Sequence, residues 1–260
     1  MKHIAITLLY FQISFFAKSQ EAVEIRRFEV SQSKQAVAVD QNHFYVINNT
    51  SITKHSKKDG KETGRWSAAE ADIQHLNSGI IMDNKLYCAN SNYPESPMAS
   101  SVEIFDPVEL EHIGNRSFGI GNGSLTWVDQ KEGFWWAVFA HYTGRGAEAG
   151  KDNSWTRLVK YDLEWRQLES WIFPKSLLER FNTRSNSGGL WVGDQLYLTG
   201  HDAPEIYIIQ LPKAGYELEW IKTIPVNIAG QGIALDQTDG RTIIYGILRK
   251  DGVVTVSEVK

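Results

Sequence analysis

The feature that most constrains this chain is a pattern of residues that occurs twice, about 110 residues apart. The two copies run from Leu76 to Glu95 and from Ser185 to Glu205. Their matching positions are Asn77-Ser78-Gly79 with Asn186-Ser187-Gly188, Leu86-Tyr87 with Leu196-Tyr197, and Pro94-Glu95 with Pro204-Glu205. Internal repetition at a regular spacing is the signature of repeat architectures, in which one small structural unit recurs around a ring or along an array.

The same unit occurs five times along the chain. Each copy has an apolar strand, a short turn rich in Asn, Asp and Gly, and a second strand with an aromatic residue, because those turn residues tolerate the positive φ of tight hairpins. The aromatic markers are spaced by 42, 49, 61 and 48 residues and are Tyr45, Tyr87, Trp136, Tyr197 and Tyr245. A second hairpin follows most of these pairs. Four strands per unit predict an all-β chain folded as a five-bladed β-propeller.

The two ends of the repeat region predict how the ring closes. The fifth unit ends with one outer strand, residues 253–259, and lacks its fourth. An unassigned apolar stretch, residues 23–30, precedes the first unit and can complete the last blade. Pairing these stretches removes the exposed edges of the ring. One helix is predicted between blades, at residues 175–181 after Pro174.

Residues 1–19 have the features of a secretory signal peptide. They contain a basic start at Lys2, an apolar run at residues 4–16, and small residues at Ala17 and Ser19. The apolar run is too short to span a bilayer, and its flanks are those of a cleaved signal. We therefore expect an exported protein, periplasmic or secreted, in which residues 20–260 form a single propeller domain. A lone Cys88 cannot form an internal disulfide, so packing must supply the stability.

The charge of the chain narrows the class of partner. Without Lys2 and Lys18 the chain has 25 basic and 31 acidic residues, a net charge of −6. It has no basic stripe, so a nucleic acid is not an expected partner, and no second long apolar segment that would hold it at a membrane. We expect a monomer that binds a small anionic or sugar-derived molecule.

The propeller pattern brings residues from different blades to one face. The inner strand of each blade starts at this face and the second strand returns to it, so the residues flanking the pair meet there. The candidates expected on this face are His75, Asn77, Asn122, Arg184, Asn186, Gln231, Asn90, Tyr93, His141, Tyr142, His201, Asp202 and Arg249. The remaining histidines after the signal, His43, His55 and His112, fall elsewhere in the pattern and receive no role.

Three histidines from three blades, His75, His141 and His201, predict a functional cluster. Imidazole can act as acid, base or metal ligand near neutral pH. Together with Gln231 these histidines are candidate ligands for one divalent metal, Zn, Mn or Fe. The sequence has no motif of closely spaced ligands that would favour a metal site. The alternative interpretation, in which these histidines bond loop carbonyls on a polar rim, therefore stays open.

Other residues receive roles from their chemistry. Arg184 and Arg249 are placed to bind a substrate carboxylate, which Arg pairs with bidentately. Asp202 or Glu205 is expected to orient His201. The residues expected to contact substrate are Asn77, Tyr93, Tyr142, Asn186 and Asp202. The Gly-rich loop of residues 143–154 follows His141 and is either a lid or a solvated surface loop.

Several motifs together resemble a family of bacterial exported propeller proteins labelled cycloisomerase. These motifs are His75-Leu76-Asn77-Ser78-Gly79, Ser91-Asn92-Tyr93-Pro94-Glu95, Phe139-Ala140-His141-Tyr142, Ser185-Asn186-Ser187-Gly188-Gly189, Gly200-His201-Asp202-Ala203-Pro204-Glu205 and Gly230-Gln231-Gly232-Ile233-Ala234. The resemblance covers essentially all of residues 20–260 and implies the propeller fold. Its label, an analogy to propeller-type muconate-lactonising enzymes, implies a lyase or cycloisomerase acting on a small carboxylate or sugar acid.

A lyase or isomerase of this kind removes a proton beside a carboxylate, and the developing charge needs a metal or fixed donors. His75, His141, His201 and Gln231 are the residues expected to supply them. Two alternatives stay open. One is a glutaminyl-peptide cyclotransferase, because plant-type glutaminyl cyclases also have five blades and are secreted, although their motifs are not recognised here. The other is a propeller that binds a ligand or protein without turnover.

Overall fold

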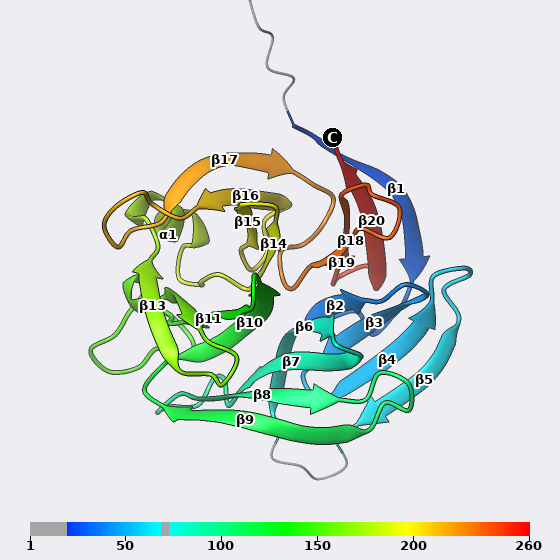
Figure 1. Cartoon of the computed structure of the whole chain (residues 1–260), viewed down its shortest axis with the longest axis horizontal. Coiled ribbons are helices and arrows are strands. Elements are labelled where there is room, and N and C mark those ends of the chain that lie inside the picture. Colours follow the sequence, from blue (N-terminus) through cyan, green and yellow to red (C-terminus); the bar gives the residue numbers. More distant parts are fainter. Residues whose placement is uncertain (1–19, 69–72) are drawn as a thin grey trace, which may run out of the picture.

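The computed structural model describes residues 20–68 and 73–260. The predicted signal peptide, residues 1–19, lies outside these described residues. In the described part, five four-stranded antiparallel sheets are arranged around a central axis (Figure 1). The prediction of an all-β, five-bladed β-propeller is confirmed.

The blades follow one another along the chain. Blade 1 consists of β2 (Ala36–Val39), β3 (His43–Asn48), β4 (Ser51–Ser56) and β5 (Glu62–Ser67). Blade 2 consists of β6 (His75–Met82), β7 (Lys85–Ser91), β8 (Ala99–Phe105) and β9 (His112–Ile120). Blade 3 consists of β10 (Ser124–Lys131), β11 (Phe134–Ala140), β12 (Arg157–Tyr161) and β13 (Gln167–Ile172). Blade 4 consists of β14 (Gly188–Val192), β15 (Gln195–Thr199), β16 (Glu205–Gln210) and β17 (Glu219–Pro225). Blade 5 consists of β18 (Ala234–Asp236), β19 (Ile243–Leu248), β20 (Val253–Val259) and β1 (Ala22–Glu29).

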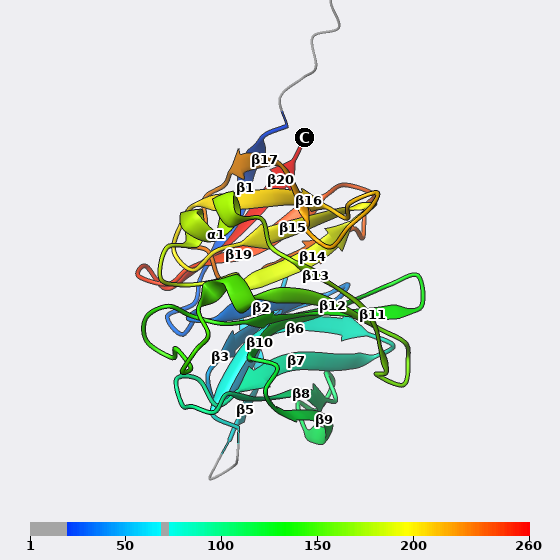
Figure 2. The ribbon, with the colours of Figure 1, turned by 90° about the vertical axis from the view of Figure 1, so that its left-hand side faces the viewer.

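The fifth blade closes the ring as predicted. β1, the first strand of the described chain, pairs antiparallel with β20 in a register that runs from Ala22 opposite Val259 to Glu29 opposite Val253. Figures 1 and 2 show the blue β1 beside the red β20 from two directions. The first and last strands of the propeller are therefore joined by main-chain hydrogen bonds rather than by a covalent link.

The hairpins between inner strands use the turn chemistry that the sequence predicts. Asp83 and Asn84, between β6 and β7, have φ values of 47° and 57°. Glu132 and Gly133, between β10 and β11, have φ values of 54° and 76°. Two consecutive residues with positive φ form a turn whose twist matches that of the flanking strands. Such turns set the register of these two inner hairpins, and Glu132 takes a positive φ in one of them although the sequence pattern favours Asn, Asp or Gly there.

Apolar clusters fill the interfaces between neighbouring blades. In the described part of the chain there are five such interfaces, and each has a cluster of buried side chains. The cluster between blades 3 and 4 contains Trp127, Trp136 and Trp191, and the short helix α1 (Lys175–Phe181) packs on it through Leu177 and Phe181. Large aromatic side chains dominate the free energy of such interfaces because each buries much apolar area.

Helical structure contributes little to the described fold. It consists of α1, at the predicted position, and one 3₁₀ turn, η1 (Asn153–Trp155). Within residues 20–68 and 73–260, no helix has the length and apolar character needed to cross a membrane.

The closing strand provides the first prediction, because it presents both a buried and an exposed apolar side chain. Phe28 is 6% exposed and its ring lies 4.7 Å from that of Phe44 in blade 1, whereas Val23 is 41% exposed. We expect Phe28→Ala to lower the free energy of unfolding by about 3–5 kcal/mol, since it leaves a cavity between blades 5 and 1. Val23→Ala, the matched control, should lower it by less than about 1 kcal/mol. Urea denaturation measures both values, and equal losses would contradict the closure role of Phe28.

Candidate functional site

A cavity of about 370 Å³ opens on the face at which the inner strands begin, and we call it the central pocket. All five blades contribute to it, through residues just before or at the start of an inner strand and residues just after a second strand. Its lining residues are Gln35, Asn49, Gln74, His75, Asn77, Tyr93, Pro94, Thr126, Tyr142, Arg145, Arg184, Ser187, His201, Gln231 and Arg249. The repeat therefore gathers side chains that are up to about 200 residues apart in the sequence.

Many of the residues selected from the sequence line this pocket. They are His75, Asn77, Tyr93, Tyr142, Arg184, His201, Gln231 and Arg249. Five others do not line it. Asn90, His141 and Asn186 are buried elsewhere, and Asn122 accepts a hydrogen bond from Arg157. Asp202 lies at the edge, where it contacts two of the lining residues.

The central pocket is electropositive. Its lining contains Arg145, Arg184 and Arg249 together with two histidines, and no Asp or Glu. Arg184 donates a hydrogen bond from Nη1 to the Tyr93 hydroxyl at 3.1 Å, which fixes its guanidinium at the pocket wall. Arg145 makes no ion pair within residues 20–68 and 73–260. Fixed cationic groups in a concave, partly dehydrated site attract an anion strongly, because the surrounding protein screens charge less than water does.

His75 is neutral at physiological pH. Its pKa is lowered to about 4, first by burial and then by the positive fields of His201 and Arg145. Its ring packs against Tyr93, with ring centroids 5.1 Å apart, and makes no hydrogen bond within the described residues. A neutral imidazole offers one donor and one acceptor. His75 is thus available to hydrogen-bond a ligand without adding charge.

His201 belongs to a chain of polar contacts at the pocket rim. Its Nδ1 lies 2.6 Å from Oδ2 of Asp202, and the other carboxylate oxygen of Asp202 pairs with Arg249. Burial lowers the pKa of His201, and Asp202 opposes that shift. The carboxylate favours the tautomer with the proton on Nδ1, which leaves Nε2 able to accept a proton. Of the two residues expected to orient His201, Asp202 is the one that contacts it, whereas Glu205 pairs with Arg180.

His141 has a different environment from the other two histidines. It is 4% exposed; its Nε2 lies 3.2 Å from the Asn122 carbonyl and its Nδ1 lies 3.1 Å from Glu148. Glu148 also accepts a hydrogen bond from the Met98 amide at 3.1 Å. These contacts fasten the loop of residues 143–154 to the propeller at Glu148, although most of its residues are exposed to solvent.

The fastened loop delivers Arg145 to the central pocket. The next residue, Gly146, has φ 84°, and a Cβ there would lie 2.5 Å from Cε2 of Tyr93. Only glycine allows this approach, so the loop backbone lies directly against the tyrosine ring. Sequence reasoning missed Arg145 because only these packing contacts direct it inward. The other lining residues that it missed are Gln35, Asn49, Gln74 and Thr126, whose sole signal was their position beside strand ends, and Pro94 and Ser187, which belong to the repeated motif.

The four residues proposed as metal ligands do not form one set. His75, His201 and Gln231 line the pocket, but His141 is engaged by Glu148, and the side-chain nitrogen of Gln231 donates to the His201 carbonyl at 2.9 Å. Among the described residues, no group of three or more His, Cys, Asp or Glu side chains is placed to hold a metal ion. Asn186, proposed as a substrate contact, is fully buried and accepts a hydrogen bond from the Trp127 indole at 2.6 Å. Asn186 therefore supports the fold.

The inner strands nearly meet beneath the central pocket. A Cβ on Gly232 would lie 2.4 Å from Cβ of Ala36 and 2.5 Å from Oγ of Ser78, and one on Gly188 would lie 2.5 Å from the Gln231 carbonyl oxygen. A second cavity of about 270 Å³ lies farther along the axis. The two cavities have no lining residue in common, so this glycine constriction separates them.

The comparisons with known proteins place the fold. No protein-family model and no curated protein sequence matches the chain. Among solved structures, the propeller is similar to the glutaminyl cyclase of Myxococcus xanthus, at 10% identity and a TM-score of 0.63 over 93% of this chain and 97% of that one. It is also similar to a Thermus thermophilus protein assigned as an oxidoreductase (glucose dehydrogenase), at 9% identity and a TM-score of 0.52 over 93% and 100% of the two chains.

These similarities establish the propeller fold and nothing finer, because the identities are so low. Of the resemblance stated from the sequence, the propeller fold is supported, and no family model supports the label cycloisomerase. The WD40 repeats of RRP9 align more loosely, with 10% identity and a TM-score of 0.46 over 86% and 79% of the chains.

The environment of His75 gives a second prediction. Its pKa is about 4 in the folded chain, against an ordinary value of 6.5. The unfolded chain therefore binds a proton at the His75 ring more readily than the folded chain does. As the pH falls from about 6.5 to about 4, protonation of this ring favours the unfolded chain, and the free energy of unfolding decreases. We expect NMR titration of the His75 ring to give a midpoint near 4, and His75→Gln to reduce the acid-induced loss of stability in that window. In an Arg145→Gln variant the pKa of His75 should rise. A midpoint near 6.5 in the wild-type protein would contradict the buried, electropositive environment.

Proposed function

We propose that the protein binds a small carboxylate, such as a sugar acid, in the central pocket. The observation that supports this is the charge of the lining, which has three arginines but no Asp or Glu. Guanidinium groups bind carboxylates through paired, charge-assisted hydrogen bonds. A volume of about 370 Å³ lies in the range typical of sites for small molecules. On the basis of residues 1–19, we also propose that the protein is exported and meets this ligand outside the cytoplasm.

The polar groups around the arginines suit a hydroxylated carboxylate. Neutral His75, the Asn77 and Gln74 amides and the Tyr93 hydroxyl line the same cavity. Amides and a neutral imidazole each supply both donors and acceptors, which match hydroxyl groups. Arg145 and Arg184 would take the carboxylate, and the neutral side chains would contact the rest of the ligand.

A third prediction tests this binding. We expect Arg145→Gln to weaken the affinity for galacturonate by roughly 10- to 100-fold, since it removes a charged hydrogen-bond donor from the pocket. Arg241→Gln is the matched control, because it removes the same charge from an exposed turn, where Arg241 pairs with Asp239. Isothermal titration calorimetry at two ionic strengths measures both effects, and binding through charge should weaken as salt rises. Equal affinities for the two variants would refute a carboxylate site at Arg145.

A glutaminyl-peptide cyclotransferase is the second candidate function. The observation that favours it is the similarity in fold to a glutaminyl cyclase over nearly the full length of both chains. In that reaction the terminal amine nitrogen attacks the side-chain amide carbon; a new C–N bond forms and ammonia leaves. The arginines would disfavour the protonated amine and so keep it nucleophilic. His201, oriented by Asp202, is placed to pass the proton from the attacking nitrogen to the departing ammonia.

The charge of the pocket ranks this candidate second. No carboxylate lines the central pocket to bind a peptide ammonium group. The lyase or cycloisomerase reading would also use His201 as the base and the arginines for the enolate-like charge, and it has no matching family model. The cyclotransferase and the lyase or cycloisomerase hypotheses therefore both depend on the His201 imidazole. An assay of turnover distinguishes either enzyme from a protein that only binds its ligand.

The fourth prediction addresses turnover. If the protein is a cyclotransferase, incubation with a Gln-initiated peptide releases ammonia and the peptide loses the corresponding mass. The rate should fall by roughly 10²- to 10⁴-fold in His201→Gln, because that substitution removes the proton-transferring imidazole. An Asn-initiated peptide is the control substrate, and sugar acids in the same screen test for lyase activity. Absence of ammonia release beyond the protein-free rate would eliminate the cyclotransferase while leaving the carboxylate site to be judged by calorimetry.

A further inference from the structure

A larger cavity, about 710 Å³, lies between blades 1 and 2, and we call it the interblade cleft. Its walls are the end of β5 in blade 1 and strands β7, β8 and β9 in blade 2. Most of its lining differs from that of the central pocket; Gln74 is shared by both. The inference below concerns this cleft and does not rest on the function proposed for the central pocket.

The interblade cleft is lined mainly by polar side chains, whereas the other parts of the blade interfaces are filled by apolar ones. Nearer the β6–β7 turn, blades 1 and 2 meet through apolar side chains such as Tyr45, Leu86 and Phe105. Toward the face of the central pocket, the same side of blade 2 instead carries Asn90 and Glu103. Both are buried, and the Glu103 side chain is only 3% exposed. A buried carboxylate is costly unless it is fully paired, so Glu103 at this blade interface needs hydrogen-bond partners for both of its oxygens.

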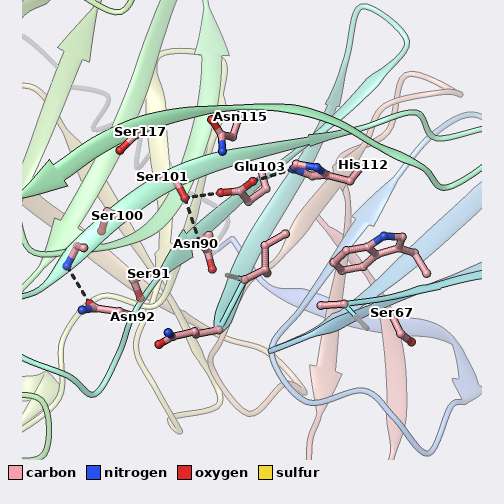
Figure 3. Close-up of a pocket in the computed structure, with 15 residues that line it drawn as sticks. Ser67, Asn90, Ser91, Asn92, Ser100, Ser101, Glu103, His112, Asn115 and Ser117 are labelled. Atoms are coloured by element: carbon pink, nitrogen blue, oxygen red, sulfur yellow. Dashed lines mark hydrogen bonds and ion pairs between the residues drawn. The ribbon is translucent and has the colours of Figure 1, made fainter. Parts of the chain in front are cut away.

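The buried polar side chains form one connected network. Figure 3 shows Asn90, Ser101, Glu103 and His112 in sequence across the cleft wall. The Asn90 amide donates to the Ser101 hydroxyl at 3.0 Å, Ser101 donates to Glu103, and the other Glu103 oxygen lies 2.8 Å from Nε2 of His112. Each carboxylate oxygen therefore has a partner. The network holds its members rigidly and leaves them little capacity to change partners.

Other polar groups of the cleft have spare hydrogen-bonding capacity. The amides of Gln74 and Asn115 and the hydroxyl of Ser67 make no side-chain hydrogen bond within residues 20–68 and 73–260. Each amide supplies two donors and one acceptor at neighbouring atoms. Trp66, half-buried and packed edge-on to Phe105 at 4.7 Å, adds an aromatic wall.

We propose that the interblade cleft binds a neutral, polyhydroxylated ligand, that is, a sugar ring or short neutral oligosaccharide. The lining contains no Lys or Arg, and Glu103 would repel a carboxylate, so the cleft selects against the anions that suit the central pocket. Paired amide donors and acceptors match vicinal hydroxyls, and an aromatic ring packs against the apolar face of a sugar ring. The volume accommodates a ligand of that size.

The test uses the protein of residues 20–260 and a panel of neutral probes: methyl glucopyranoside, methyl galactopyranoside and cellobiose. We expect at least one probe at millimolar concentration to shift the NMR signals of the Trp66 indole and of backbone amides in β8 and β9. The double variant Asn115→Ala/Ser117→Ala should weaken that binding by roughly tenfold or more, since it removes exposed hydrogen-bonding groups from the cleft.

Arg116→Ala is the matched control. Side chains alternate along a strand, so Arg116 lies on the other side of β9 from its neighbours Asn115 and Ser117, and its field acts on Tyr161 of blade 3. Its probe affinity should equal that of the wild type. Three outcomes would each overturn the proposal: no probe shifts any cleft signal, the shifts lie on central-pocket residues, or the double variant binds as tightly as the control. If the double variant fails to fold, Asn115→Ala alone supports the same comparison.

Discussion

The main-chain ladder between β1 and β20 is the interaction on which the rest of this structure depends. Every other neighbouring pair of strands within a blade is consecutive in the sequence, but these two come from opposite ends of the described chain. An open ring would expose strand edges and separate the apolar cluster that β1 shares with blade 1. Because all five blades position the central pocket, this one ladder fixes the spacing of side chains such as His75 and Arg249 across the axis.

Charge is distributed unevenly over a chain that is acidic overall. The arginines of the central pocket stand opposite no lining carboxylate, and burial keeps His75 neutral beside them. Arg249 is balanced by Asp202 at the rim, whereas the interblade cleft has a buried carboxylate and no lining cation. Two neighbouring cavities thus differ in the charge of the side chains that line them.

The repeat made the fold and much of the candidate site predictable from the sequence. Strand periodicity and turn residues define the blades, and blade topology places His75 and His201 at one face. The direction of a side chain in an irregular loop follows from tertiary packing, which explains why His141 meets Glu148 and why Arg145 was overlooked. The interblade cleft could not be predicted from the sequence either. His112 looked like an ordinary outer-strand residue because its partner, Glu103, sits on a different strand.

The glycine constriction beneath the central pocket affects how a ligand could enter and leave it. With Gly188 and Gly232 holding the inner strands in contact, the axis of this propeller is a blind well rather than a tunnel. A ligand must leave through the opening by which it arrived, past the same arginines that attracted it. Residence time and capture rate are therefore coupled: stronger attraction at the rim speeds arrival and slows departure together. If the pocket is catalytic, its product has the same single route out, so charge at the rim acts on substrate and product alike.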